Sequence, residues 1–186
     1  MDAASIATAL NALVPGASVE ALAHGDQPTV AVPPSRWPAV AVALRDDAGL
    51  AFTALVDIAG VDLLPKDPRF ELNYHLVAPD LHPPARLRVK IAVGGADPRV
   101  PTATDVWPAA NFLEREVWDL MGVVFSGHPD LRRLLTPEDW EGHPQRKDYP
   151  VQVNRPVKTD EAIQLTAEQF RANIRRDRAV REDGSR

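Results

Sequence analysis

Apolar residues recur at helical spacing in three segments of the chain, residues 3–14, 35–44 and 105–121. The third segment has the clearest ends, because Asp105 is a candidate N-cap and Gly122 can adopt the left-handed conformation that often closes a helix. Each segment predicts a helix with one buried face. In the third helix the buried stripe is predicted to consist of Leu113, Val117, Leu120 and Met121.

A different pattern, the alternation of apolar and polar residues, marks residues 50–61, 70–78 and 86–93 as strands. Two shorter runs within residues 19–32 fit a hairpin. Alternation means that each strand buries only one face, as in an antiparallel or mixed sheet that is covered on one side. Together with the helices, this order predicts a two-layer α+β domain over residues 1–122, with helices on one face of the sheet.

The composition changes after Gly122. Residues 126–150 contain nine charged residues and four prolines but only five large apolar residues, too few to form a core of their own. Thr166, with Gln169 at the spacing of a capping box, predicts a short helix near the end of the chain. Residues 123–186 are therefore predicted to form an extended tail that wraps over a partner and includes that helix.

Composition also narrows the classes of function. The chain has 186 residues and a formal net charge of -5, which disfavours bulk binding to nucleic acid. It has no cysteine, so it cannot by itself hold a thiolate-ligated zinc ion or iron–sulfur cluster. No apolar run approaches the ~18 residues that a membrane-spanning helix needs. Because the first basic residue is Arg36, a secretory signal is not indicated, and an intracellular protein is expected.

Four charged residues of the third helix permit two interpretations: Glu114, Arg115, Glu116 and Asp119. Carboxylates beside a cation can act in acid–base catalysis, since the neighbouring charge shifts their pKa values. The same residue types also make up an ordinary solvated helix face. Because nothing in the sequence indicates a pocket around them, the exposed face is the favoured interpretation.

His128 and His143, with Asp130 between them, are candidate metal ligands. Their spacing matches no helical pair of ligands, and each histidine precedes a proline in loop-like sequence. One alternative is a stand-alone metal-dependent hydrolase that uses these three residues. The other is that the two imidazoles fix loops by bonding to nearby groups, and this is favoured because zinc sites usually show closer ligand pairs.

Arginine, lysine and aspartate residues are interleaved at residues 130–133 and 146–148. Guanidinium groups among carboxylates are typical of bidentate ion pairs across a protein interface. Interleaved acids and sparse aromatic residues disfavour binding to phosphates, so nucleic acid is not the expected partner. Since the segment has too little apolar content to order itself, the pattern indicates an assembly subunit whose tail lies along a neighbour.

Three ordered strings of residues carry a family resemblance. They are residues 114–120 (EREVWDL), 127–135 (GHPDLRRLL) and 146–150 (RKDYP), and similar sequence extends over residues 52–156. Together they strongly resemble the C-type subunit, the 30 kDa subunit family, of respiratory NADH-quinone oxidoreductase (complex I). Gln145 departs from the family, which usually has an apolar residue at this position.

The resemblance implies a non-catalytic structural subunit in the hydrophilic arm of a proton-translocating NADH:quinone oxidoreductase. Members of the family have an α+β fold, hold no cofactor, and pack on the large D-type subunit, which helps to form the quinone pocket. FMN, iron–sulfur clusters and quinone would then belong to partner subunits, including the neighbouring iron–sulfur subunits. The chain would be peripheral on the cytoplasmic face of the bacterial inner membrane, attached through the complex. The equivalent subunit of a related hydrogenase-type membrane complex is an alternative.

No residue is expected to be catalytic or to bind a metal or cofactor, and twelve residues are expected to form the partner interface. Their charged and imidazole groups would fix the register between subunits. They are Glu114, Arg115, Glu116, Asp119, His128, Asp130, Arg132, Arg133, His143, Arg146, Lys147 and Asp148.

Overall fold

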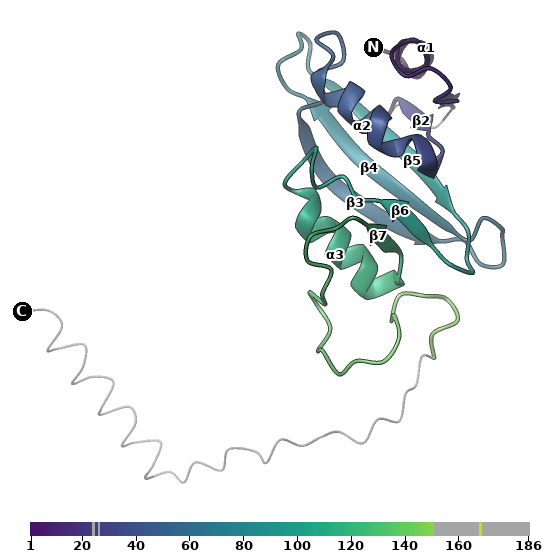
Figure 1. The fold of residues 1–186 in the computed structure, drawn as a ribbon, viewed down its shortest axis with the longest axis vertical. Coiled ribbons are helices and arrows are strands. Elements are labelled where there is room, and N and C mark those ends of the chain that lie inside the picture. The colour runs from purple at the N-terminus through teal and green to yellow at the C-terminus, as the bar shows by residue number, and fades with distance from the viewer. Residues whose placement is uncertain (24, 26, 151–167, 169–186) are drawn as a thin grey trace, which may run out of the picture. The chain divides into compact units, whose positions relative to one another are not determined.

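Three α-helices and seven strands make up the part of the chain that this computed structural model describes, residues 1–23, 25, 27–150 and 168 (Figure 1). The helices are α1 (Ala3–Leu13), α2 (Trp37–Asp46) and α3 (Ala110–Met121), with a 3₁₀ turn, η1 (Pro34–Arg36), before α2. The strands are β1 (Glu20–Leu22), β2 (Thr29–Ala31), β3 (Ala54–Asp62), β4 (Phe70–Ala78), β5 (Ala85–Val93), β6 (Arg99–Pro101) and β7 (Val124–Ser126).

Five strands form one mixed sheet in the order β1-β2-β5-β4-β3. Strands β3, β4 and β5 pair antiparallel along most of their length, and the hairpin of β1 and β2 joins the sheet through a parallel pairing of β2 with β5. These strands are the ones that alternation predicts, because side chains of successive strand residues point to opposite faces. The predicted α+β class with a mixed sheet is confirmed.

The helices cover one face of this sheet (Figure 1). Alternate residues of β4 and β5 are buried there, and the ring of Tyr74 on β4 lies 4.4 Å from that of Trp37 on α2. Gly60 of β3 allows α3 to lie close to the sheet, because a Cβ at this position would overlap the side chain of Met121 and press on Val117. The core is therefore formed between the sheet and the three helices.

Helix α3 begins later than its sequence predicts. Asp105 is not its N-cap; the N–H groups of Val106 and Trp107 instead donate to the carbonyl of Ala103 in a turn that precedes the helix. The indole of Trp107 is buried and donates to the backbone oxygen of Phe52 at 3.0 Å. This tertiary contact holds the chain in a turn that local propensity alone does not predict.

Two of the helix faces that were predicted to be buried are only partly buried. In α3, Val117 and Met121 are buried, whereas Leu113 and Leu120 are half-buried and pack against the core from its edge. In α1, Leu13 shares its helical spacing with buried residues but is 47% exposed. Leu13 is the last residue of the helix, and the buried residues of α1 lie in its earlier turns, at Ile6, Ala7 and Leu10.

The compact unit that contains the sheet runs from Met1 to Pro150, beyond the predicted domain boundary at residue 122. Strand β7 lies after that boundary and pairs in parallel with β6, and Phe125 within it is buried. Both strands have only three residues, too few for alternation to reveal them. The helix predicted from Thr166 falls, except for Glu168, outside the described residues.

Burial predicts how two leucines differ in their effect on stability. Leu72 on β4 is fully buried, so Leu72→Ala is expected to lower the free energy of unfolding by ~2–5 kcal/mol through lost contacts and a cavity. Leu13→Ala removes the same atoms from an exposed site and is expected to change the free energy of unfolding by less than ~0.5 kcal/mol. Urea unfolding of the purified full-length chain measures both, and equal losses would contradict the described core.

Candidate functional site

The carboxylate of Asp119 holds the loop that follows α3. Asp119 lies in the last turn of α3 and is 0% exposed. Its Oδ2 accepts bonds from the backbone N–H groups of Leu134 (2.9 Å), Leu135 (2.7 Å) and Thr136 (2.9 Å). Its Oδ1 accepts from Arg133 Nη1 at 2.7 Å and from the Thr136 hydroxyl. One buried carboxylate thus collects five donors from a segment that has little apolar content.

Asp119 is ionised at neutral pH. Burial alone would raise its pKa, but the hydroxyl and N–H of Thr136, with the N–H groups of Leu135 and Leu134, outweigh burial and hold the pKa well below its usual range. Arg133 supplies the opposite charge and also donates to the carbonyls of Trp140 (2.6 Å) and Gly142 (3.2 Å). The pair therefore fixes two separate stretches of the loop.

Arg115 provides a second contact between α3 and the loop. Its side chain is buried and donates to the carbonyls of Arg132 and Arg133, each at 3.2 Å. Its guanidinium also lies 5.6 Å from the centre of the Phe112 ring. We call residues 127–150 the docking loop, and Arg115 and Asp119 together fix its first half to the helix.

The second half of the docking loop bonds to the C-terminal end of α3. Arg146 Nε donates to the carbonyl of Met121 at 2.6 Å, and His143 Nδ1 donates to that of Asp119 at 2.9 Å. These side chains satisfy carbonyls that a helix end leaves free. Gly122 makes this approach possible, because its φ is +73° and a Cβ there would collide with both His143 and Arg146.

An ion-pair cluster joins the end of the docking loop to the sheet. Arg69 Nη2 lies 2.8 Å from Asp62 Oδ2 and 2.6 Å from Asp148 Oδ1, and the N–H of Lys147 donates to Asp62 Oδ2 at 2.9 Å. The bonds from Arg69 outweigh burial and lower the pKa of Asp62 well below its usual range. Asp62 and Arg69 were not predicted as site residues, since neither belongs to a recognisable motif in the sequence.

Glu114 is a buried carboxylate of a different kind. Its Oε1 accepts from the N–H of Ala103 at 2.7 Å and its Oε2 from the Thr102 hydroxyl at 2.5 Å, and no cation pairs with it among the described residues. Burial therefore raises the pKa of Glu114 to about 7, against the opposing effect of the bonds from Thr102 and Ala103. Both carboxylate oxygens are engaged by the protein itself.

The predicted solvated helix face is therefore wrong for three of its four residues. Glu114, Arg115 and Asp119 are buried, and only Glu116 is exposed. Charged residues are buried when specific partners satisfy them, and here those partners lie after β6, in the turn before α3 and in the docking loop. The identity of those partners cannot be inferred from helical periodicity.

Both candidate metal-ligating histidines bond to the backbone. His128 Nδ1 accepts from the N–H of Asp130 at 3.1 Å, so its Nε2 carries the proton and donates to the carbonyl of Asn111 at 3.0 Å. His143 Nδ1 donates to the carbonyl of Asp119 in α3. In the described ranges no three histidine, aspartate or glutamate side chains gather as a metal site. Both imidazoles thus bond to backbone carbonyls of α3, as the loop-fixing interpretation predicts.

The twelve predicted interface residues fall into two groups. The buried or half-buried ones bond within the chain: Glu114, Arg115, Asp119, His128, Arg133, His143 and Arg146. The exposed ones are Glu116, Asp130, Arg132, Lys147 and Asp148. Within the described structure, intrachain bonds hold the segment to Pro150, whereas its low apolar content predicted that a partner would order it. A partner interface stays a prediction.

Several large apolar side chains near the docking loop face solvent. Phe112 and Leu135 are each 61% exposed, and Leu134 is exposed beside Leu135. Their backbone is held by α3 and by Asp119, so these side chains are presented on a fixed surface.

Each helix in the described part of the chain is too short or too polar to cross a bilayer.

Comparison with known proteins gives one consistent match. A family model described as "Respiratory-chain NADH dehydrogenase, 30 Kd subunit" matches residues 30–155. The C-type subunit of NADH-quinone oxidoreductase from Roseiflexus sp. (strain RS-1) is 43% identical over 151 residues, which cover 81% of this chain and 86% of that protein. The protein of the same name from Herpetosiphon aurantiacus is 51% identical over 114 residues, 61% of this chain and 66% of that protein.

Two solved structures have a similar fold. A trypsin-resistant fragment of Nqo5 is 39% identical with a TM-score of 0.52, and the match covers 61% of this chain and 88% of the fragment. A chain of the membrane-bound sulfane sulfur reductase, an archaeal respiratory membrane complex, is 27% identical with a TM-score of 0.59, covering 80% of this chain and 85% of that chain. The sequence comparisons and the fold comparison therefore both relate this chain to subunits of respiratory complexes.

Removing the charge of Asp119 is expected to release the docking loop. Asp119→Asn leaves Arg133 half-buried without a counter-charge and points an amide at backbone donors, so stability should fall by ~3–5 kcal/mol. Trypsin should then cleave after Arg132 or Arg133 much faster than in the wild type. Asp130→Asn, which alters an exposed pair with Arg132, is the matched control and should leave cleavage unchanged. Equal protection in both variants would contradict the role of Asp119.

Glu114 is expected to make stability fall as the pH rises. Because its folded pKa of about 7 lies above the ordinary 4.5, the protonated carboxyl contributes stability that is complete below pH 4.5 and is lost as the pH rises to about 7. Relative to Glu114→Gln, the wild type should lose ~3 kcal/mol across this window, at ~1.4 kcal/mol per pKa unit. Urea unfolding at several pH values measures the difference. Glu116→Gln, at an exposed position of the same helix, is the control. If the stability difference between wild type and Glu114→Gln did not change with pH, the raised pKa of Glu114 would be refuted.

Proposed function

This chain belongs to the 30 kDa subunit family of respiratory-chain NADH dehydrogenase, and on that premise we propose that it is a non-catalytic structural subunit of a proton-translocating NADH:quinone oxidoreductase. It lies in the hydrophilic arm and docks on the large D-type subunit, which helps to form the quinone pocket. FMN, iron–sulfur clusters and quinone are held by partner subunits. The complex attaches it to the cytoplasmic face of the bacterial inner membrane.

The observation that carries this proposal is the fixed docking loop. A loop rich in charge and proline is held in one conformation by Asp119, by the end of α3 and by Arg69, although it contributes little to the core. The residues that were candidates for catalysis or metal binding instead hold the docking loop. Asp119 accepts hydrogen bonds from it, and His128 and His143 donate to backbone carbonyls. Such an arrangement supports a rigid binding surface rather than a reaction.

The surface of the docking loop has the character of an interface. Leu135 and Phe112 are exposed apolar residues, and Arg132 is exposed on the same segment as Leu135. Interfaces are enriched in aromatic, large apolar and arginine side chains, and a preformed surface loses less conformational entropy on binding. The loop therefore supports docking of a partner with few changes in its own conformation.

A single exposed leucine tests this function. Leu135→Asp places a charge in the proposed interface, and its exposure means that the chain itself should fold normally. Tagged full-length chain, purified from detergent-solubilised native membranes, should lose most of its D-type partner relative to wild type, as measured by mass spectrometry, with NADH:quinone reductase activity falling in parallel. Leu13→Asp, on α1, is the matched control and should retain both. Full recovery of the D-type partner with Leu135→Asp would overturn the proposed docking surface.

A second host complex is supported by the match to a chain of the sulfane sulfur reductase. In this alternative the protein is the equivalent subunit of a related membrane complex of the hydrogenase type, with another electron donor. The same purification separates the two proposals, because only the first yields NADH-oxidising partner subunits.

A further inference from the structure

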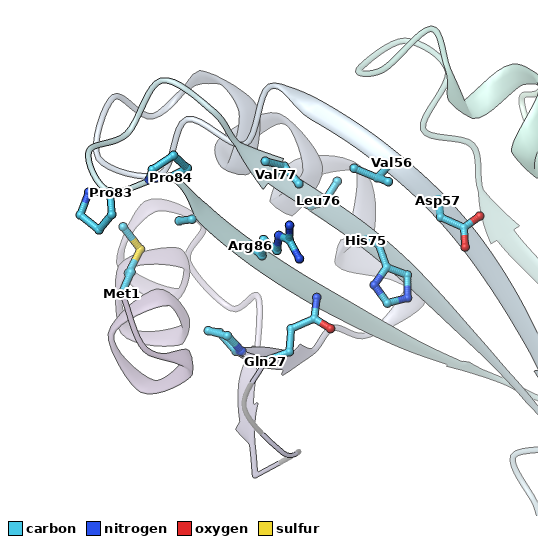
Figure 2. A pocket seen from close by; sticks show the side chains of 12 residues that line it. Met1, Gln27, Val56, Asp57, His75, Leu76, Val77, Pro83, Pro84 and Arg86 are labelled. Carbon is cyan, nitrogen blue, oxygen red and sulfur yellow. The ribbon is translucent and has the colours of Figure 1, made fainter.

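The face of the main sheet that the helices leave uncovered carries a groove of about 900 Å³ (Figure 2). Strands β3, β4 and β5 form its floor. Val77 and Pro84 line one end, while Arg86, His75 and Gln27 give the remainder a polar lining. We call this the sheet groove, and it involves none of the residues of the docking loop.

Strand β5 gives the sheet groove a positive charge. Arg86, Arg88 and Lys90 occupy alternate positions on β5 and therefore share the open face, and of these three Arg86 lines the sheet groove itself. Lys90 pairs with Glu71 at 3.0 Å and is neutralised. Neither arginine has a carboxylate at ion-pair distance among the described residues; Arg88 Nη2 donates to the neutral side chain of Gln27 at 2.8 Å.

The side chain of Arg88 is incompletely satisfied. Its Nε is buried and has no hydrogen-bond acceptor in the described part of the chain. A buried N–H is normally bonded, and a guanidinium bonds most strongly to a carboxylate. Burial, followed by the charge of Arg88, lowers the pKa of His75, so this imidazole is neutral at pH 7 and the arginines supply the positive charge.

The spacing of these groups indicates the shape of an occupant. Arg86 and Arg88 are two residues apart on one strand, about 7 Å, which is also the distance between alternate side chains of an extended peptide. Asp57 lies opposite His75 on β3, so the groove is negative on that side and positive over β5. Exposed Val56 and half-buried Val77 add an apolar surface.

We propose that the sheet groove binds an extended acidic segment of a neighbouring subunit, whose carboxylates pair with Arg86 and Arg88 and whose apolar side chain packs on Val56 and Val77. This inference rests on the proposed function, because it assumes an assembly, but it places a second contact on the opposite face of the sheet from the helices. The acidic residues of the segment lie over β5, since Asp57 repels them from β3.

Charge reversal at the exposed arginine tests the inference. Arg86→Glu should lower recovery of the subunit that supplies the acidic segment at least several-fold in the tagged-chain purification, with a steeper loss as salt is raised. Arg86→Lys should restore most of it. Arg36→Glu makes the same charge change at an exposed arginine on the helix side of the sheet and is the matched control. Unchanged recovery of every partner with Arg86→Glu would overturn the sheet groove as a docking site.

A photocrosslinking residue in place of Val56, in the assembled complex, identifies the occupant. A crosslink to an Asp- or Glu-rich peptide of another subunit supports the inference. A crosslink to residues 151–186 of the same chain, or no crosslink in an intact complex, overturns it while the proposed function stands. If the wild-type chain recovers no partner subunits, the proposed function fails first and the inference fails with it.

Discussion

The buried carboxylate of Asp119 is the interaction on which the order of the docking loop depends. A loop with few apolar residues cannot gain enough from hydrophobic burial to offset the entropy of ordering it. Five hydrogen bonds to one ionised carboxylate, with Arg133 as counter-charge, supply the missing constraint. Because the donors come from consecutive residues, the carboxylate fixes backbone direction as well as position.

The other contacts of the docking loop extend this arrangement. Arg146 and His143 satisfy carbonyls at the end of α3, and Arg69 joins Asp62 on the sheet to Asp148 in the loop. Because polar bonds to helix and sheet order the loop, Leu134 and Leu135 are free to face outward. Polar bonds thus order the loop while apolar side chains stay on its surface. Leucines buried in the core would strengthen the fold but would leave less apolar surface for a partner.

Periodicity predicted the parts of the fold in which burial follows the pattern of the chain. Helices α1 and α2 and strands β3–β5 are of this kind, because each presents apolar residues to one core. The buried state of Glu114 and Asp119 could not be predicted in this way, because it depends on partners at Thr102 and in the docking loop that folding brings together. The family resemblance identified the chain, but the same strings of residues do not reveal which charges bond within it. The sheet groove was not predicted either, since alternating charged residues such as Arg86 and Arg88 are typical of the solvent-exposed face of any strand.

Hydrogen–deuterium exchange of the purified full-length chain, without partners, tests most directly whether Asp119 orders the docking loop. The backbone N–H groups of Leu134, Leu135 and Thr136 donate to Asp119 and should exchange far more slowly than those of an unfolded chain, at rates that approach those of α3. Exchange of these three groups at unfolded rates, with α3 still protected, would contradict the account and would mean that the loop needs a partner to become ordered.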